Sequence, residues 1–425
     1  MNIRYANIIP LIGGMTIANI NATGKFPVAI FSYAPFNNNE KHIRKYFEDR
    51  NINVPYIVLD DNPIFNVDDY KNLDFVSSVC PCAGMSLLNT NNKQRGSNAP
   101  QNDWLIKSSE FVLGQLEPKV YWGENAPGLY SELNIDIANR LKEIGKKYGY
   151  TFSIYKTDTK FHGIPQGRAR TFFFFWKLNN QVPVLGYYKR ETPLYVDWMT
   201  PDKNEGPYKN IFIKYKFPDD ESKEYVYIKS KYHNNDYKDL YNFCNKHNIR
   251  TTSAYLQNYV TGLDAVNAYK EYLKWLENND GDKKVSLSGA GFHTFKTKAE
   301  FYITKFMQGK GVFDISPIFA FDNCPAIIPK NVHRQLHPTE ERFISVQESM
   351  KLMGLPEDFE LASDPLKCWE HICQNVPVCT AEDMTKEVID FIYNYQHYYI
   401  NTDFLKQNNL THNIDYVEKT AKPLF

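Results

Sequence analysis

The chain has 425 residues, enough for two or three folding units, and 43% of them are hydrophobic, so a large core is available. Lys+Arg and Asp+Glu both total 49, which excludes a strongly basic protein whose overall charge attracts nucleic acid. Any basic surface has to be local. No run of about 18 apolar residues occurs, which predicts that no segment spans a membrane.

The start of the chain lacks the basic-then-apolar layout of a signal peptide. Seven cysteines are scattered through the chain and do not form a disulfide framework. Cys80 and Cys82 form a C-x-C pair, but no second Cys/His pair at zinc spacing accompanies them, so no metal site is predicted. These features predict a reduced, cytoplasmic protein.

Strand and helix signals alternate over residues 1–184. Residues 40–47 and 135–148 have helical periodicity. Thr171–Trp176 contains four consecutive Phe, which is typical of a strand buried on both sides. Short runs rich in β-branched and aromatic residues predict further strands at 8–12, 28–31, 56–59, 75–79 and 120–122. The alternation predicts an α/β fold, with a doubly wound, mostly parallel sheet covered on both faces.

The pattern changes after about residue 184. Residues 185–335 show no strand–helix alternation, are dense in Lys, Tyr and Asn, and carry 22 Lys+Arg against 18 Asp+Glu. Helical patterning returns near Arg342, and residues 381–395 form a plausible amphipathic helix. We therefore expect one domain that is built from 1–184 and completed by 336–425, with 185–335 as a separate domain.

Cys82 follows directly after the predicted buried strand 75–79, in a Pro-Cys loop. In an open α/β sheet, ligands bind at the carboxyl ends of the strands. A thiol at this place can be ionised by backbone N–H groups or by a nearby cation. Taken alone, however, the segment fits an inert buried cysteine better than a reactive one.

Two later segments carry charged residues that could face the same crevice. Glu124 ends the strand at 120–122 and is followed by Asn125, although an acid at this place could equally cap the next helix. Arg168 and Arg170, spaced i, i+2 before the Phe-rich strand, point to the same side of an extended segment. They could stabilise a thiolate or hold a phosphate or carbonyl oxygen, or they could be ordinary surface arginines.

Taken together and in order, these segments resemble the 5-cytosine DNA methyltransferase family. That family carries Pro-Cys followed by Ser, then Glu-Asn, then Gln-x-Arg-x-Arg, as here around Cys82, Glu124 and Arg168. The resemblance extends over 5–184 and 336–395, and leaves 185–335 as a variable target-recognition domain. Two later blocks also match, namely Arg342–Glu348 with Leu352–Pro356, which supports the target-recognition domain in the family, and the terminal block Gln374–Pro377.

The resemblance implies a Rossmann-like enzyme that transfers the methyl group of S-adenosylmethionine to C5 of cytosine. Cys82 would add to C6 of a cytosine that is flipped out of the duplex, and Glu124 would hydrogen-bond or protonate N3. Arg170 would hold O2 of the base, and Arg168 would lie nearer the thiolate and the backbone phosphate. Other substrate contacts are implied for Ser86, Asn125 and Gln166, and the polar loop 86–102 is expected to close over DNA. Cofactor contacts are implied for Gly13, Gly14, Ser32, Asp60, Asp61, Pro81, Leu105, Gln374, Asn375 and Val376.

Several family features are absent, and they cluster around the cofactor pocket. The first block usually reads Phe-x-Gly-x-Gly, whereas here only Gly13 and Gly14 remain and Leu11 stands at the earlier glycine. The acid that usually ends the second strand and binds the ribose hydroxyls is missing, and Ser32 could accept only one hydroxyl. Further departures are Ala83 for Gln after the Pro-Cys, and Cys373 and Gln374 for Gly and Asn in the last block.

The partner implied by the resemblance is double-stranded DNA, for a monomer with no obligate protein partner. One alternative is a related pyrimidine enzyme that transfers another group, such as hydroxymethyl from a folate. A second is an RNA substrate, which the large insert argues against. A third is an inactive DNA-binding homologue, which is disfavoured because Cys82, Glu124, Arg168 and Arg170 are all present.

Overall fold

A computed structural model describes residues 2–60, 63, 65–86, 96–178, 181–186, 188–199, 206–212, 284–287, 291–294, 323–329, 332, 335–338, 340, 342–393 and 399–401. The chain forms two compact units. The first unit consists of Met1–Pro193, Gly206–Tyr208 and Ser349–Phe425, and the second of Leu194–Glu205 and Lys209–Glu348. The first unit thus combines the N-terminal and C-terminal parts of the chain. The division of function at residues 184 and 335 stays a prediction.

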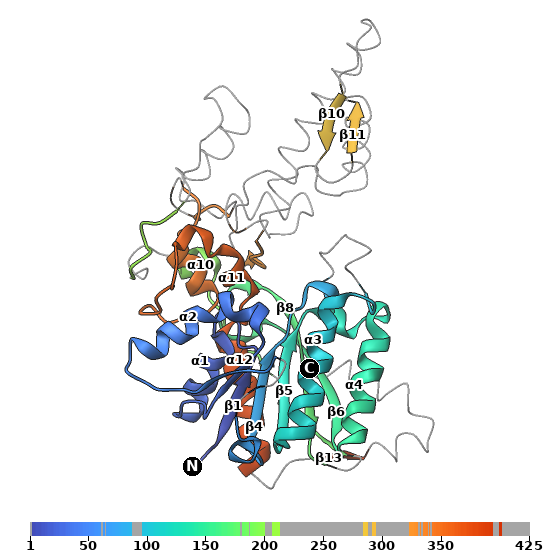
Figure 1. Ribbon diagram of the computed structural model, residues 1–425. Helices are drawn as coiled ribbons and strands as arrows, with labels where there is room; N and C mark the ends of the chain where they lie inside the picture. The colour runs from blue at the N-terminus through green and yellow to red at the C-terminus, as the bar shows by residue number, and fades with distance from the viewer. Residues whose placement is uncertain are drawn as a thin grey trace, which may run out of the picture. The chain divides into compact units, whose positions relative to one another are not determined.

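The first unit is built on a seven-stranded sheet with the strand order β3-β2-β1-β4-β5-β8-β6 (Figure 1). The strands β1 to β5 run parallel, and β8 lies antiparallel between β5 and β6. This confirms the predicted α/β fold with a mostly parallel sheet. The strand bounds are β1 (Tyr5–Ile8), β2 (Ile30–Ser32), β3 (Tyr56–Val58), β4 (Phe75–Val79), β5 (Val120–Asn125), β6 (Thr151–Asp158) and β8 (Ala169–Trp176).

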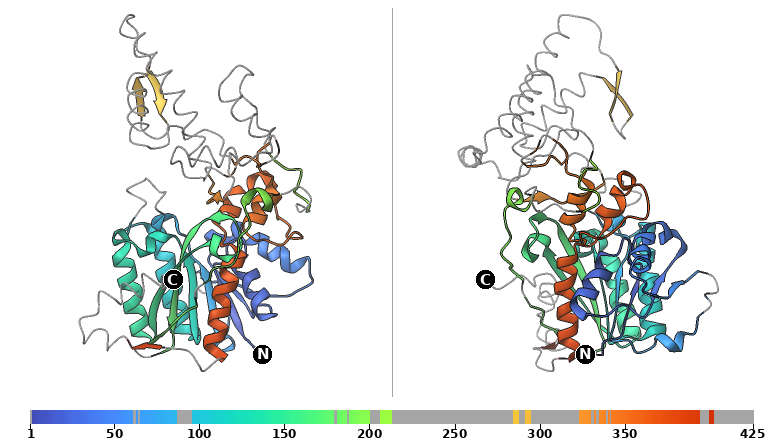
Figure 2. Two further views of the ribbon diagram at one scale, coloured as in Figure 1. Left: turned by 180° about the vertical axis from the view of Figure 1, so that it is seen from behind. Right: turned by 90° about the vertical axis from the view of Figure 1, so that its left-hand side faces the viewer.

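Helices cover both faces of this sheet. Figures 1 and 2 show α3 and α4 on one face and α1 with α12 on the other. In α4 the buried residues Ile137, Leu141 and Ile144 recur at helical spacing, which explains the exposed charged face opposite them. The helix bounds are α1 (Gly14–Thr23), α2 (Asn37–Glu48), α3 (Asp103–Phe111), α4 (Ile135–Lys147) and α12 (Val378–Tyr393).

The Phe-rich strand β8 lies at the centre of the core. Its residues from Phe172 to Trp176 are all fully buried. Trp122 on β5 stacks on Phe174 with ring centroids 6.0 Å apart, and Tyr121 stacks on Phe175 at 5.6 Å. Because both faces of β8 are covered by side chains, its sequence has no polar alternation.

The last helix fastens the C-terminal part of the chain to the first helix. The Thr385 hydroxyl on α12 donates to Asn19 Oδ1 on α1 at 2.8 Å, and both residues are buried. Farther along, β13 (Tyr399–Asn401) pairs antiparallel with β9 (Gln181–Pro183). No helix among the residues described above is long and apolar enough to cross a membrane.

The second unit contains the hairpin of β10 (Lys284–Leu287) and β11 (Gly291–Thr294), and the short helix α5 (Tyr195–Trp198). The block around Arg342 forms a compact hydrogen-bonded group there. Arg342 donates to both carboxylate oxygens of Glu348 at 2.8 and 2.7 Å. Glu348 accepts from the Ser345 N–H, and Ser345 Oγ accepts from the Glu348 N–H. This reciprocal pair is a capping box at the start of α10 (Val346–Leu352).

Candidate active site

Cys82 lies in the loop that leaves the carboxyl end of β4. The thiol is half-buried and precedes a short 3-10 turn, Ala83–Met85. Cys80 is buried, with 1% of its surface exposed, and burial raises the pKa of its thiol to about 12. The structure therefore leaves Cys82, rather than Cys80, at the mouth of the strand.

The register of the sheet brings Glu124 and Arg170 to the same place. Val79, the last residue of β4, pairs with Glu124 on β5, and Glu124 pairs with Phe172 on β8. Arg170 lies two residues before Phe172 on the same strand, and its Nε is 2.5 Å from Glu124 Oε1. Both side chains are largely buried, so this ion pair is shielded from water.

Cys82 and Glu124 influence each other's ionisation. Burial raises the pKa of Glu124, and the Arg170 and Arg168 guanidinium groups oppose that rise. Burial and the Glu124 carboxylate raise the pKa of Cys82, whereas the same two arginines lower it. Two acidic groups this close do not ionise together easily, so a proton on Glu124 favours a thiolate on Cys82.

Arg168 is buried against the segment that precedes α12. Its terminal Nη2 donates to the carbonyl of Cys373 at 2.7 Å and to that of Asn375 at 3.0 Å. Burial, helped by repulsion from Arg170, lowers the pKa of Arg168 to about 9. The residue therefore joins the arginine segment to residues 373–375, an arrangement that the sequence did not suggest.

The same segment closes over the start of α1. The Gly14 N–H donates to Asn375 Oδ1 at 2.9 Å, and a Cβ on Gly14 would lie 2.4 Å from the Val376 carbonyl oxygen. Gly13 has a φ of 113°, which favours glycine. Ile9 and Leu11 also have positive φ angles, of 49° and 51°. Such strain in branched residues is typical of backbones held in place by function.

Comparison with known proteins identifies the family. The model of the C-5 cytosine-specific DNA methylase family matches residues 4–390. The chain belongs to this family. No curated protein sequence matches it significantly.

Solved structures of other methylases share the fold at low identity. A DNA modification methyltransferase encoded within an E. coli prophage is 16% identical, with a TM-score of 0.51 over 92% of this chain and 99% of that chain. The Entamoeba histolytica methyltransferase EhMeth is 11% identical, with a TM-score of 0.49 over 93% of this chain and 100% of that chain. A DNMT2 variant from Spodoptera frugiperda is 14% identical, with a TM-score of 0.42 over 91% of this chain and 100% of that chain.

Several of the implied cofactor residues surround the β1–α1 turn of this methylase. Asn375 Nδ2 is buried and has no hydrogen-bond partner, which leaves a donor for a polar ligand group. Ser32 is buried at the end of β2, and Asp60 Oδ2 accepts from the Ala34 N–H at 3.0 Å. This donor set fits S-adenosylmethionine, which carries an amino acid and a ribose. Leu105 and Val376 are buried, Pro81 and Gln374 are half-buried, and Asp61 lies outside the described residues.

The implied substrate residues have different surroundings. Asn125 is buried, with Oδ1 accepting from the Ala126 N–H and Nδ2 without a partner. Gln166 is buried, and its amide donates to the Leu352 carbonyl at 2.7 Å. Ser86 is half-buried after the Cys82 turn. Of the predicted loop 86–102, residues 87–95 lie outside the described part of the chain, so closure over DNA stays a prediction.

One more polar group was missed by sequence reasoning. Glu40 on α2 is fully buried, and Tyr56 donates to its Oε2 at 2.5 Å. Burial raises the pKa of Glu40 to about 7, although the hydroxyls of Ser32 and Tyr56 oppose the rise. An acidic residue on the buried face of a predicted amphipathic helix was the signal that could have revealed it.

His42, Cys368 and His371 form a cluster whose side chains could serve as metal ligands. His42 Nδ1 accepts from the Ala362 N–H at 3.0 Å, so the ring proton is on Nε2, which lies 2.9 Å from His371 Nδ1. Hydrogen bonds already engage both rings, and the expectation of no metal site stays a prediction.

Proposed function

We propose that this chain methylates C5 of cytosine in double-stranded DNA with S-adenosylmethionine as the methyl donor. One observation carries the proposal: Cys82, Glu124 and Arg170 follow or end three adjacent strands and meet at the same edge of the sheet. They supply a nucleophile, a proton donor and a fixed cation, which addition to a cytosine ring requires.

The reaction begins when the Cys82 thiolate adds to C6 and forms a sulfur–carbon bond. The electrons of the C5–C6 double bond move into the ring, toward N3 and O2. Glu124, whose pKa is raised by burial, gives a proton to N3, and Arg170 stabilises the charge on O2. The ring carbon C5 thereby becomes enamine-like and nucleophilic.

Gly14, Asn375 and Ser32 would hold the cofactor beside this ring. When bound, S-adenosylmethionine supplies an electrophilic sulfonium methyl group for C5. A base, for which water suffices, then removes the C5 proton, the C5–C6 double bond re-forms, and the sulfur–carbon electron pair returns to Cys82. A base within a stacked duplex cannot reach these groups, so the target nucleotide has to leave the helix.

A duplex that carries 5-fluorocytosine tests this proposal, because fluorine at C5 cannot leave as a proton does. We expect a stable covalent adduct that requires S-adenosylmethionine, survives Cys80→Ser and is absent in Cys82→Ser. An adduct that persists in Cys82→Ser would overturn the mechanism.

The same assay separates the alternative substrates and activities. An RNA carrying 5-fluorocytosine that reacts faster than the duplex would move the assignment to RNA. Mass analysis of the product on ordinary cytosine distinguishes methyl from hydroxymethyl transfer. A wild-type chain that binds DNA and forms no adduct on either nucleic acid would be an inactive homologue.

A further inference from the structure

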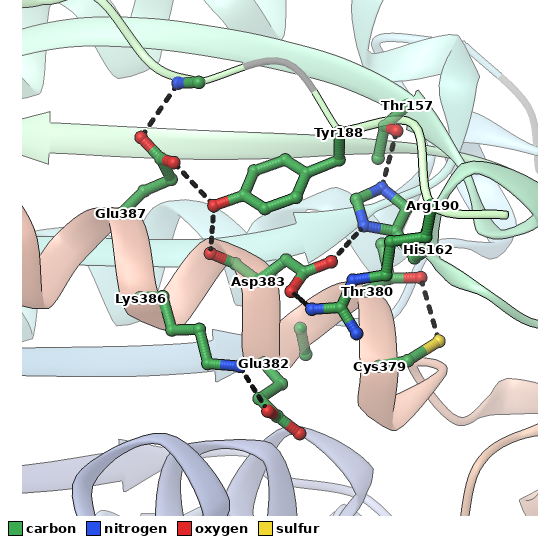
Figure 3. Close-up of polar contacts among 12 residues, drawn as sticks. Thr157, His162, Tyr188, Arg190, Cys379, Thr380, Glu382, Asp383, Lys386 and Glu387 are labelled. Atoms are coloured by element: carbon green, nitrogen blue, oxygen red, sulfur yellow. Dashed lines mark hydrogen bonds and ion pairs between the residues drawn. The ribbon is translucent and has the colours of Figure 1, made fainter.

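A second buried polar cluster lies between α12 and the turn that precedes the arginine segment (Figure 3). His162 Nδ1 is 2.8 Å from Asp383 Oδ2, and His162 Nε2 is 2.7 Å from the Thr157 hydroxyl. Asp383 comes from α12, Thr157 from β6, and His162 from the 3-10 turn Thr159–His162. The side chains of His162 and Asp383 are fully buried.

The order carboxylate, imidazole, hydroxyl is also that of hydrolase triads. Here the imidazole and the carboxylate have no exposed surface, so no substrate reaches them. A buried carboxylate is costly unless several donors satisfy it. His162 serves one oxygen of Asp383, and Arg190, which is 44% exposed, pairs with the other. The group is therefore suited to holding segments together.

What the group holds is the strand that carries the arginines. Thr157 is the direct partner of Arg170 in the β6–β8 ladder. The Thr159 N–H donates to the Arg168 carbonyl at 3.1 Å, and the Arg168 N–H donates to Asp158 Oδ1 at 3.1 Å. His162 thus ends a short turn whose other residues fix the backbone of both arginines.

The connector of residues 186–192, which leaves the first unit shortly afterwards, is tied to α12 at two places (Figure 3). One tie is the Arg190–Asp383 pair, and the Arg190 N–H also donates to the Phe161 carbonyl at 2.9 Å. The other tie is Glu387, which accepts from the Tyr188 hydroxyl at 2.5 Å and from the Gly186 N–H at 2.9 Å. Of these two ties, the Arg190–Asp383 pair is the one whose carboxylate also binds His162.

We propose that Asp383 and His162 are positioning residues for the reaction, which hold Arg170 against Glu124 through Thr157, and that Arg190 on the connector completes this brace. The proposal rests on the proposed function, because Arg170 matters only if it acts on the base. Displacement of a group by about 1 Å can reduce a reaction rate by up to about a hundredfold. The brace is therefore expected to affect the rate of reaction with bound DNA more than the affinity for DNA.

The test compares Asp383→Asn with Glu387→Gln, which cuts the other tie between the same helix and the same connector. We expect Asp383→Asn to slow adduct formation on 5-fluorocytosine DNA at saturating DNA and cofactor by about tenfold or more. The dissociation constants for DNA and S-adenosylhomocysteine should change by less than about threefold. Glu387→Gln should lower Tm yet leave the rate within about twofold of wild type.

Amide hydrogen exchange gives a second readout that does not depend on activity. Asp383→Asn should speed exchange of the 168–172 amides, and Glu387→Gln should not. If Asp383→Asn does not fold, Arg190→Met removes one half of the brace from a partly exposed position, and Arg190→Lys should restore much of the rate.

Equal rate losses in Asp383→Asn and Glu387→Gln, or unchanged exchange at 168–172, would overturn the proposal. A wild-type chain that forms no adduct at all would instead refute the proposed function, while the exchange result would still decide whether the brace fixes the arginine strand.

Discussion

At the scale of single residues, Cys82 and Glu124 share one difficulty, which is that two negative charges have to be accommodated in a buried place. The Glu124 carboxylate raises the pKa of Cys82, and Arg170 and Arg168 lower it. The reaction needs the opposite charges, with a thiolate beside a protonated Glu124. The pair can therefore be probed by neutralising Glu124.

Glu124→Gln is expected to make the thiol more acidic and the enzyme slower. The neutral amide removes the repulsion on the thiolate, so the pKa of Cys82 falls and alkylation by iodoacetamide near pH 7 speeds up by about threefold or more. Adduct formation with 5-fluorocytosine DNA should slow by about a hundredfold, because the proton for N3 is lost. Labelling in Cys82→Ser gives the background, and slower alkylation in Glu124→Gln would contradict the assignment.

Glu40 predicts a second pH effect, this time on stability. Its pKa is raised to about 7 by burial, so between about pH 4.5 and 7 the folded chain keeps a proton that the unfolded chain releases. The contribution of Glu40 to stability therefore declines as pH rises through this interval. Glu40→Gln should leave the free energy of unfolding nearly unchanged at pH 4.5 and raise it by about 1–3 kcal/mol at pH 8.

Denaturant unfolding at the two pH values measures this difference. Glu48→Gln on the exposed side of the same helix is the matched control and should change little at either pH. A Glu40→Gln variant that is less stable than wild type at pH 8 would show that the carboxylate is needed in its charged form.

At the scale of elements, the β1–α1 turn and residues 373–376 pack so closely that glycine is required between them. A Cβ on Gly14 would lie 2.2 Å from Asn375 Oδ1 and 2.4 Å from the Val376 carbonyl oxygen. Arg168 holds the other side of the same segment through the Cys373 and Asn375 carbonyls. The cofactor residues and the arginine segment are therefore mechanically linked.

Gly14→Ala should displace this segment and lower affinity for S-adenosylhomocysteine by at least about tenfold, with a loss of about 1–3 kcal/mol in stability. Gly24→Ala at the other end of α1 is the matched control. Gly24 has a φ of 65°, but nothing lies within 4 Å of its added Cβ. It should cost about 1 kcal/mol from backbone strain and leave affinity unchanged. Calorimetry and unfolding decide, and equal affinity losses would refute the link.

At the scale of the whole molecule, the chain leaves the first unit after Pro193 and returns for good at Ser349. The returning part supplies Asn375 and Asp383 to the first unit. The second unit contains most of 185–335, the segment predicted to read the DNA target. Its excess of Lys+Arg over Asp+Glu suits contacts with phosphate.

Exchanging Lys209–Glu348 for the equivalent segment of another cytosine methylase should change the methylated sequence. Affinity for S-adenosylhomocysteine should remain within about threefold, because the cofactor residues lie in the first unit. Bisulfite sequencing of DNA from expressing cells reads the target. An unchanged target sequence in the exchanged chain would show that the first unit reads the DNA.

The sequence by itself determined the α/β fold and which residues are candidates for chemistry. Buried strands have apolar runs that are visible locally, and residues just after such runs, such as Cys82 and Glu124, must lie at the edge of the sheet. The one misplaced strand is the first. Residues 8–12 were predicted as a strand, yet β1 ends at Ile8, because the backbone turns at Ile9 and Leu11 with positive φ angles.

Only the tertiary structure decided what the candidate side chains touch. Arg168 meets Cys373 and Asn375, and His162 meets Asp383, across more than 200 residues of chain. Periodicity reports whether a residue is buried, but it does not report its partner. That partner is set when α12 packs on α1 and when β8 inserts between β5 and β6. The pKa values of Glu124 and Cys82 depend on the same packing, because burial and neighbouring charges are properties of the assembled site.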